Sequence, residues 1–206
     1  EKTWSTAQMT GDLFERGAVQ KENGEFHVGF NGVGRKLNSI FARGYVELRV
    51  TEYMARAPYN YYFMDCDATG EIYDDFSSLH PMSLEQDAAE RCGRLEWIGS
   101  RFNSVIGSEG GNAYAARSID VAEGILAPYF GWDEPEMKNK DSKYYRGRYF
   151  PPDAPEVNFK PVPMKERFIK KYHDAAFQIP LYAAAYHDSV VATAHWANAQ
   201  FKFPEV

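Results

Sequence analysis

The clearest structural signal in this chain is the stretch YYFMDCDATGE at residues 61–71. Aromatic and apolar residues run directly into two carboxylates, Asp65 and Asp67, and then into a loop that contains Gly70. A short apolar run bounded by polar residues and glycine predicts a buried β-strand. A strand that ends in acids is typical of (β/α) barrels, which place their chemistry at the carboxyl ends of the strands.

A second stretch with the same pattern, SVIGSEGG, spans residues 104–111 and ends in Glu109 and two glycines. Between the two stretches, residues 84–102 repeat apolar side chains at helical spacing. Two strands joined by a helix pair in parallel, and neighbouring parallel strands lie about 4.8 Å apart. Asp65 and Glu109 are therefore expected at adjacent positions on one edge of a parallel sheet.

Two carboxyl groups in such positions can cleave a glycosidic bond. In a retaining glycosidase they lie about 5–5.5 Å apart, and one attacks the sugar while the other protonates the leaving oxygen and then activates water. We interpret Asp65 and Glu109 as this candidate catalytic pair. Each acid also has a simpler structural explanation, because Asp65 can cap the turn after its strand and Glu109 can be a surface-loop acid.

Polar residues also follow a later apolar segment, which begins at residues 177–182. We interpret His187 and Asp188 as closing a strand there, where the histidine can donate to a sugar hydroxyl and the aspartate can accept from one. The alternative is a satisfied core histidine followed by a helix-capping aspartate. Together with Asp67, this pair is expected to shape the site of the reacting sugar.

A stretch rich in proline, lysine and tyrosine at residues 131–163 interrupts the alternation of strands and helices. A loop of this length in a compact domain is usually functional or mobile. We interpret it as a loop insertion that forms a lid over a cleft and brings Trp132 to the substrate. The alternative is a solvated excursion with no role in binding.

The order Asp65-Cys66-Asp67 also matches the DxD pattern with which glycosyltransferases hold a divalent metal on a nucleotide sugar. Three-residue patterns are common by chance, and no basic, glycine-rich phosphate cradle lies nearby. The histidines lack the spacing of a zinc site. We therefore expect no metal and no cofactor, and a metal-dependent glycosyltransferase remains an alternative.

The composition bounds the class of protein. The 206 residues suffice for one domain with a real core. With 29 acidic and 23 basic residues, the net charge of −6 argues against a nucleic-acid or membrane-surface partner. The 14 tyrosines, 14 phenylalanines and four tryptophans fit a large aromatic core, a sugar cleft or both. The two cysteines form no disulfide framework, and no window has the length of a membrane-spanning helix.

The remaining pattern predicts helices at residues 39–57, 84–102 and 164–173, and another through residues 190–196. The first of them is expected to bury Phe41, Tyr45, Leu48, Val50 and Met54. The helix at 84–102 begins with a Ser–Gln capping box. Strands alternate with these helices, which predicts an α/β fold with four or five parallel strands. That number is about half a barrel, and the chain opens without an initiator methionine, so we expect a piece of a longer protein.

Taken in order, these blocks resemble the catalytic barrel of the α-N-acetylgalactosaminidases of glycoside hydrolase families 101 and 129 and their relatives. The blocks that carry the resemblance are residues 62–70, residues 107–111, and residues 179–182 leading to residues 186–191. The resemblance covers roughly residues 35–200. The order of the blocks is specific to the family, whereas each block alone is not.

The resemblance implies a (β/α)8 TIM-type barrel, of which this chain would hold about strands 3 or 4 to 8. It also implies a retaining mechanism in which Asp65 is the nucleophile and Glu109 is the acid/base. The family acts on mucin-type O-glycans with α-linked GalNAc, so the expected partner is a carbohydrate or glycoprotein substrate. Other domains of a longer chain are expected, and neither nucleic acid nor membrane insertion is. A degenerate barrel that binds glycans without cleaving them is the main alternative.

Overall fold

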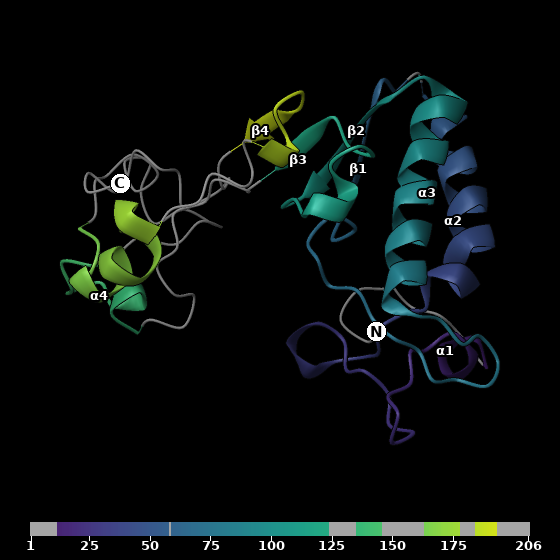
Figure 1. The fold of residues 1–206 in the computed structure, drawn as a ribbon, viewed down its shortest axis with the longest axis horizontal. Coiled ribbons are helices and arrows are strands. Elements are labelled where there is room, and N and C mark those ends of the chain that lie inside the picture. Colours follow the sequence, from purple (N-terminus) through teal and green to yellow (C-terminus); the bar gives the residue numbers. More distant parts are fainter. Residues whose placement is uncertain (1–11, 58, 124–134, 146–162, 178–183, 193–206) are drawn as a thin grey trace.

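The computed structural model describes residues 12–57, 59–123, 135–145, 163–177 and 184–192. Its centre is a parallel sheet of four strands in the order β1-β2-β3-β4 (Figure 1). The strands are β1 (Tyr61–Met64), β2 (Val105–Glu109), β3 (Val121–Glu123) and β4 (Val190–Ala192). The chain therefore has the α/β fold with a parallel sheet that its sequence predicts.

The register of the sheet brings the two candidate acids to one edge. Met64, the last residue of β1, is paired with Ser108 of β2. Asp65 and Glu109 are the next residues on the two strands, so both occupy the carboxyl edge of the sheet. Glu109 is in turn paired with Glu123 at the end of β3.

Two long helices, α2 (Ser39–Met54) and α3 (Leu84–Phe102), lie side by side, and α3 packs against β1 and β2 on one face of the sheet (Figure 1). The core between the helices and the sheet includes Leu95, Ile98, Val50, Ile106 and Ala122. Leu95 and Ile98 are fully buried. Burying one such side chain stabilises the fold by about 1.5–3 kcal/mol, so this layer holds α3 firmly against the sheet.

Helix α3 has the bounds and the capping box that the sequence predicts. The hydroxyl of Ser83 accepts from the backbone N–H of Gln86, whose side chain accepts from the backbone N–H of Ser83. At the other end, Asn103 adopts a left-handed conformation with φ of 50°, a common way to end a helix. The buried face is wider than expected, because it includes the charged residues Arg91 and Arg94.

The expected buried face of α2 is only partly right. Val50 is buried, but Leu48 is 60% exposed. The helix instead buries the small residues Ser39 and Ala42, and it ends at Met54 rather than at residue 57. Small and polar residues on a buried face leave little periodic signal in the sequence, which explains the error.

The expectation of a helix through residues 190–196 is wrong in the part that the structure describes. Val190 and Val191 lie in β4, paired with Val121 and Ala122 of β3. β-branched side chains favour strands, and here the pairing with β3 outweighs the helical spacing of the segment.

The other described elements are short. They are α1 (Leu13–Arg16), η2 (Phe30–Gly32), η3 (Ala113–Ala115), η4 (Pro135–Lys138) and η7 (Ala175–Phe177). The predicted basic helix at residues 164–173 is observed as α4 (Glu166–Phe168) followed by the π-helical turn η6 (Ile169–His173). Most of the loop at 131–163 and of the predicted strand at 177–182 lies outside the described residues. Among the helices that are described, none is long and apolar enough to span a membrane.

The face of the sheet opposite α2 and α3 carries apolar side chains that the described residues leave partly uncovered. The exposed fractions are 38% for Tyr61, 39% for Phe63, 44% for Val105 and 64% for Val190. These residues share one face because their strand positions are in register. Parallel sheets are normally covered on both faces.

Candidate active site

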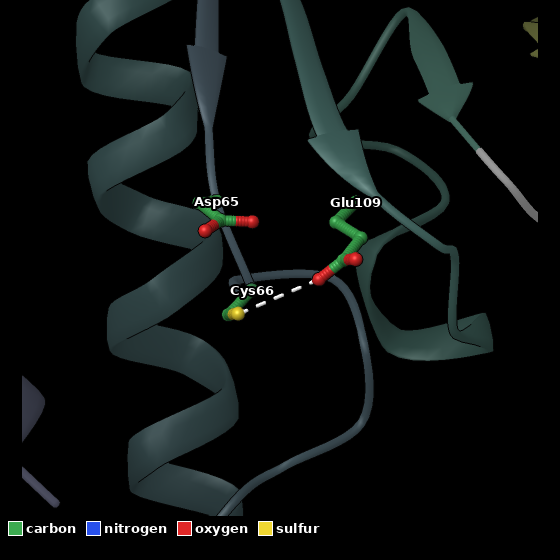
Figure 2. A group of neighbouring side chains, drawn as sticks. All are labelled: Asp65, Cys66 and Glu109. Carbon is green, nitrogen blue, oxygen red and sulfur yellow. Dashed lines mark hydrogen bonds between the residues drawn. The ribbon is translucent and has the colours of Figure 1, made fainter. Parts of the chain in front are cut away.

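The carboxyl edge of the sheet places Asp65 and Glu109 opposite each other. Asp65 follows β1 directly and is exposed, and Glu109 ends β2 and is half-buried. Figure 2 shows the two carboxylates facing across the gap between the ends of the strands, with Cys66 beside them. A carboxylate oxygen of each acid and the Cys66 sulfur all lie within 4.8 Å of one another.

Cys66 is a member of this group that the sequence did not single out. Its Sγ donates to Oε2 of Glu109 at 3.5 Å (Figure 2). Partial burial, the nearby charges of Asp65 and Glu109 and this hydrogen bond raise the pKa of the Cys66 thiol to about 12. The thiol is therefore protonated at neutral pH and serves as a hydrogen-bond donor. No motif marks such a residue, because its role depends on the register of two strands.

The backbone around Cys66 is held in a conformation that sharpens the turn after β1. Cys66 has φ of 65°, in the left-handed region that side chains other than those of glycine, asparagine and aspartate rarely adopt. The buried hydroxyl of Ser108 fixes this turn, because it donates to the carbonyl of Met64 at 2.7 Å and accepts from the N–H of Ala68 at 3.1 Å. One side chain of β2 thus ties down both ends of the turn that carries Asp65.

A third acid, Glu123, lies beside Glu109 at the end of β3. Its carboxylate accepts a hydrogen bond from the hydroxyl of Tyr61, and partial burial together with this bond raises the pKa of Tyr61. The Tyr61 ring crosses β2 over Gly107, where an added Cβ would lie 2.0 Å from the tyrosine oxygen. Glycine at this position is therefore needed for the contact between Tyr61 and Glu123. The sequence gives no sign of this contact, since it spans three strands.

Asp67 has other partners than the expected sugar. It is buried, and both of its carboxylate oxygens are bound by Arg94, with Nε donating at 2.5 Å. Arg91 lies 3.5 Å away, and the hydroxyl of Tyr114 donates to the backbone carbonyl of Asp67 at 2.5 Å. Contact between Asp67 and a sugar stays a prediction, and the pairing with Arg94 disfavours it.

The same pairing disfavours the DxD interpretation. A shared metal would need the carboxylates of Asp65 and Asp67 to converge, but the carboxylate of Asp67 is paired with Arg94 of α3. The donor atoms that do converge are those of Asp65, Cys66 and Glu109.

The expectation that His187 and Asp188 close a strand is wrong. Both precede Val190, the first residue of β4, and Nδ1 of His187 lies 3.3 Å from the backbone carbonyl of Ala184, to which it can donate. Because the strands are parallel, the amino edge of β4 is opposite the edge that carries Asp65 and Glu109. The structure therefore does not bring this pair to the two acids. Trp132, the remaining candidate, lies outside the described residues.

Comparison with known proteins gives a family and a fold. The whole chain, residues 1–206, matches the model of the glycosyl hydrolases related to the GH101 family, GH129. No curated protein matches the sequence. Among solved structures, the chain is similar to the α-N-acetylgalactosaminidase NagBb from Bifidobacterium bifidum in its GalNAc complex, with a TM-score of 0.57, 19% identity, and coverage of 91% of this chain and 25% of NagBb.

The Gal-NHAc-DNJ complex of NagBb gives the same result, with a TM-score of 0.56, 20% identity, and coverage of 91% of this chain and 24% of NagBb. This chain thus spans about a quarter of the length of the relative it matches. Structural similarity to NagBb at 19–20% sequence identity shows the fold alone. The family is shown by the family model, which matches the whole sequence. The chain belongs to glycoside hydrolase family 129, the glycosyl hydrolases related to family 101.

Proposed function

We propose that this chain carries the catalytic pair of a retaining α-glycosidase, with Asp65 as nucleophile and Glu109 as acid/base. The observation that carries the proposal is the approach of their carboxylate oxygens to within 4.8 Å. Retaining glycosidases hold their carboxyl groups about 5–5.5 Å apart, whereas inverting enzymes hold them about 6.5–9.5 Å apart to admit a water molecule. The assignment of the two roles rests on the resemblance of residues 62–70 and 107–111 to the family's nucleophile and acid/base blocks.

In the first step, the ionised carboxylate of Asp65 attacks the anomeric carbon from the face opposite the leaving group. The carboxylic acid of Glu109 gives its proton to the glycosidic oxygen as the carbon–oxygen bond breaks. The product is a sugar bound covalently to Asp65. The exposure of Asp65 suits this role, since the sugar must reach its oxygen.

In the second step, the carboxylate of Glu109 takes a proton from water as the water attacks the same carbon. The bond to Asp65 breaks, the aspartate is ionised again, and the sugar leaves with its original configuration. The thiol of Cys66 donates to Glu109, and this hydrogen bond would hold the carboxyl group toward Asp65.

The substrate proposed is an α-linked N-acetylgalactosaminide, such as the GalNAc that begins mucin-type O-glycans. The family match and the fold of NagBb, which forms a complex with GalNAc, support this choice. The chain covers a quarter of NagBb, so residues outside this chain would complete the sugar site.

The fold proposed for the complete protein is a (β/α)8 barrel in which these strands are about strands 3 or 4 to 8. The uncovered apolar side chains of Tyr61, Phe63 and Val105 support it, because the inner face of a barrel sheet is filled with such residues. Residues 1–206 would then be one part of a catalytic barrel domain, with further domains in the longer chain.

The test is hydrolysis of aryl α-GalNAc and related aryl α-glycosides by the full-length protein, with the anomer formed first identified by NMR. The α-anomer is expected first. Asp65→Ala and Glu109→Ala are each expected to lower kcat/KM about 10²–10⁴-fold. Glu25→Ala, which removes an exposed acid in a different part of the chain, serves as the control and should leave the rate unchanged.

Three results would go against the proposal. Activity that survives both Asp65→Ala and Glu109→Ala would remove these residues from the reaction. The β-anomer as first product would show inversion. Calorimetric binding of the sugar without turnover would favour the degenerate, glycan-binding barrel.

A further inference from the structure

A cavity of about 190 Å³ lies between the loop that follows β1 and the helices α2 and α3. Its polar lining consists of Lys36, Cys66, Glu71, Tyr73, Arg91 and Arg94. Cys66 also donates to Glu109, so the cavity borders the candidate active site. The proposed mechanism uses none of the cationic side chains that line it.

Two buried guanidinium groups in this lining keep spare hydrogen-bond donors. Arg91 and Arg94 are each 8% exposed. Arg94 binds Asp67 through Nε and Nη2. Arg91 binds Asp87 through Nε at 3.0 Å and directs Nη1 toward Asp67. Within the described part of the chain, Nη1 of Arg94 and Nη2 of Arg91 have no protein partner, so both can donate to an acceptor in the cavity, whether water or an anion.

Lys36 adds a third cation at the mouth of the cavity. Its Nζ pairs with Glu71 at 2.5 Å and lies 5.7 Å from the centre of the Tyr73 ring. Burial opposes the charge of Lys36, but its hydrogen bonds to Glu71 and Tyr73 outweigh burial and raise the pKa of the lysine. Lys36 is therefore an ammonium group at neutral pH.

The charges around the cavity are close to balance, since Asp67 and Asp87 neutralise the two arginines from behind and Glu71 pairs with Lys36. The cavity therefore attracts a ligand mainly through directed N–H donors rather than through net charge. A planar guanidinium group suits ligands that present two or more acceptor oxygens.

We propose that this cavity binds a small oxyanion, a sulfate or carboxylate group, through Lys36, Arg91 and Arg94. The group is either a free anion or an acidic substituent of the substrate, and both present the same oxygens to the same donors. Only the second source rests on the proposed glycosidase function.

The test is titration of the full-length protein with inorganic sulfate at constant ionic strength, maintained with chloride. Saturable binding by calorimetry and a matching rise in Tm are expected. Lys36→Gln should weaken sulfate binding at least about tenfold, the effect of losing one hydrogen bond to a charged group. Lys21→Gln removes the same charge from an exposed pair with Glu25 and should leave sulfate binding unchanged.

Arg94→Lys keeps the charge that faces Asp67 but removes the spare Nη1 donor, so it should also weaken sulfate binding if it folds. If it does not fold, Lys36→Gln alone carries the test, because that side chain is partly exposed. A rise in Tm that chloride reproduces, or sulfate binding that is equal in Lys36→Gln and Lys21→Gln, would overturn the proposal.

The source of the anion is resolved with sulfated and unsulfated aryl α-GalNAc. A KM at least about tenfold lower for the sulfated substrate, lost in Lys36→Gln, assigns the cavity to a substituent of the substrate. Equal KM values together with sulfate binding assign it to a free anion. Sulfate binding without any hydrolysis would refute the glycosidase proposal and leave the oxyanion cavity standing.

Discussion

Among single residues, Cys66 links the parts of the site that the sequence presents separately. It follows the proposed nucleophile, donates to the proposed acid/base and lines the cavity beside them. Its left-handed backbone turns the chain at the end of β1, so that Asp65 faces Glu109 while Asp67 turns toward α3. The left-handed backbone of Cys66 therefore directs two nearby aspartates to different places. Asp65 faces Glu109, whereas Asp67 pairs with Arg94.

The raised pKa of Cys66 leads to a test of its environment. With a pKa of about 12, only about one ten-thousandth of the thiol is ionised at pH 8, against about a quarter of an ordinary thiol. Alkylation of Cys66 by iodoacetamide at pH 8 should therefore be at least about tenfold slower than that of glutathione, and it should accelerate as the pH rises over the range in which the protein stays folded. Mass spectrometry of the peptide that contains Cys66 measures the rate. Alkylation at pH 8 as fast as that of glutathione would contradict this environment.

At the scale of elements, the loop after β1 is fastened to α3 by the buried pair of Asp67 and Arg94. The helix is itself held against the sheet by Leu95 and Ile98. The loop, the helix and β2 thus form one rigid support for Asp65. Such a support matters for catalysis, because small displacements of reacting groups slow a reaction strongly.

Breaking this pair should destabilise the protein severely. Asp67→Asn leaves Arg94 buried without its counter-charge, so the free energy of unfolding should fall by about 3–5 kcal/mol. Urea denaturation of the full-length protein measures the loss. Asp12→Asn removes the partner of Arg16 from an exposed pair and should change the free energy of unfolding by less than about 1 kcal/mol. Equal and small changes in the two variants would show that Asp67 does not support the loop.

The elements that the sequence predicted best are those with local signals. Helix α3 carries a capping box and an apolar stripe, and β1 and β2 are apolar runs that end in acids or glycine. The missed features depend on contacts between distant residues: the face of α2 that packs against α3, and the pairing of β4 with β3. The placement of His187 and Asp188 failed for the same reason, since the direction of a short apolar segment relative to a sheet is not encoded locally.

The candidate site shows the same division. Asp65 and Glu109 were identified because strand ends and their acids are visible in the sequence, and the register of β1 and β2 then brought them together. The pairing of Asp67 with Arg94 was not visible, because residues of opposite charge far apart in a chain give no sign that they meet. Buried arginines on α3 were missed because charged residues normally mark an exposed face.

For the whole molecule, the proposed barrel accounts for the partly exposed second face of the sheet. Phe63 and the other apolar residues on this face are partly exposed among the described residues, and the chain spans a quarter of NagBb. The proposed barrel, completed by residues outside this chain, would bury this face and would supply the remaining walls of the proposed sugar site.

The proposed barrel predicts that a new carboxylate changes the free energy of unfolding far more on the sheet face opposite α3 than on the exposed side of α2. In the full-length protein, Phe63→Glu should lower the free energy of unfolding by about 3 kcal/mol or more, because the carboxylate would be buried without a partner. Leu48→Glu, on the exposed side of α2, should change it by no more than about 0.5 kcal/mol. Thermal and urea unfolding measure both variants. Equal small effects would mean that nothing covers the sheet.

The most direct test of the central claim is to trap the covalent intermediate. Glu109→Ala still forms the sugar–enzyme bond with an activated aryl α-GalNAc, whose leaving group needs no acid, but it lacks the base that would hydrolyse the bond. Mass spectrometry of the digested full-length variant should show one N-acetylhexosamine on the peptide that contains Asp65, with the sugar on Asp65 itself. Release of product without an adduct, or an adduct on any other residue, would contradict the assignment of Asp65 as the nucleophile.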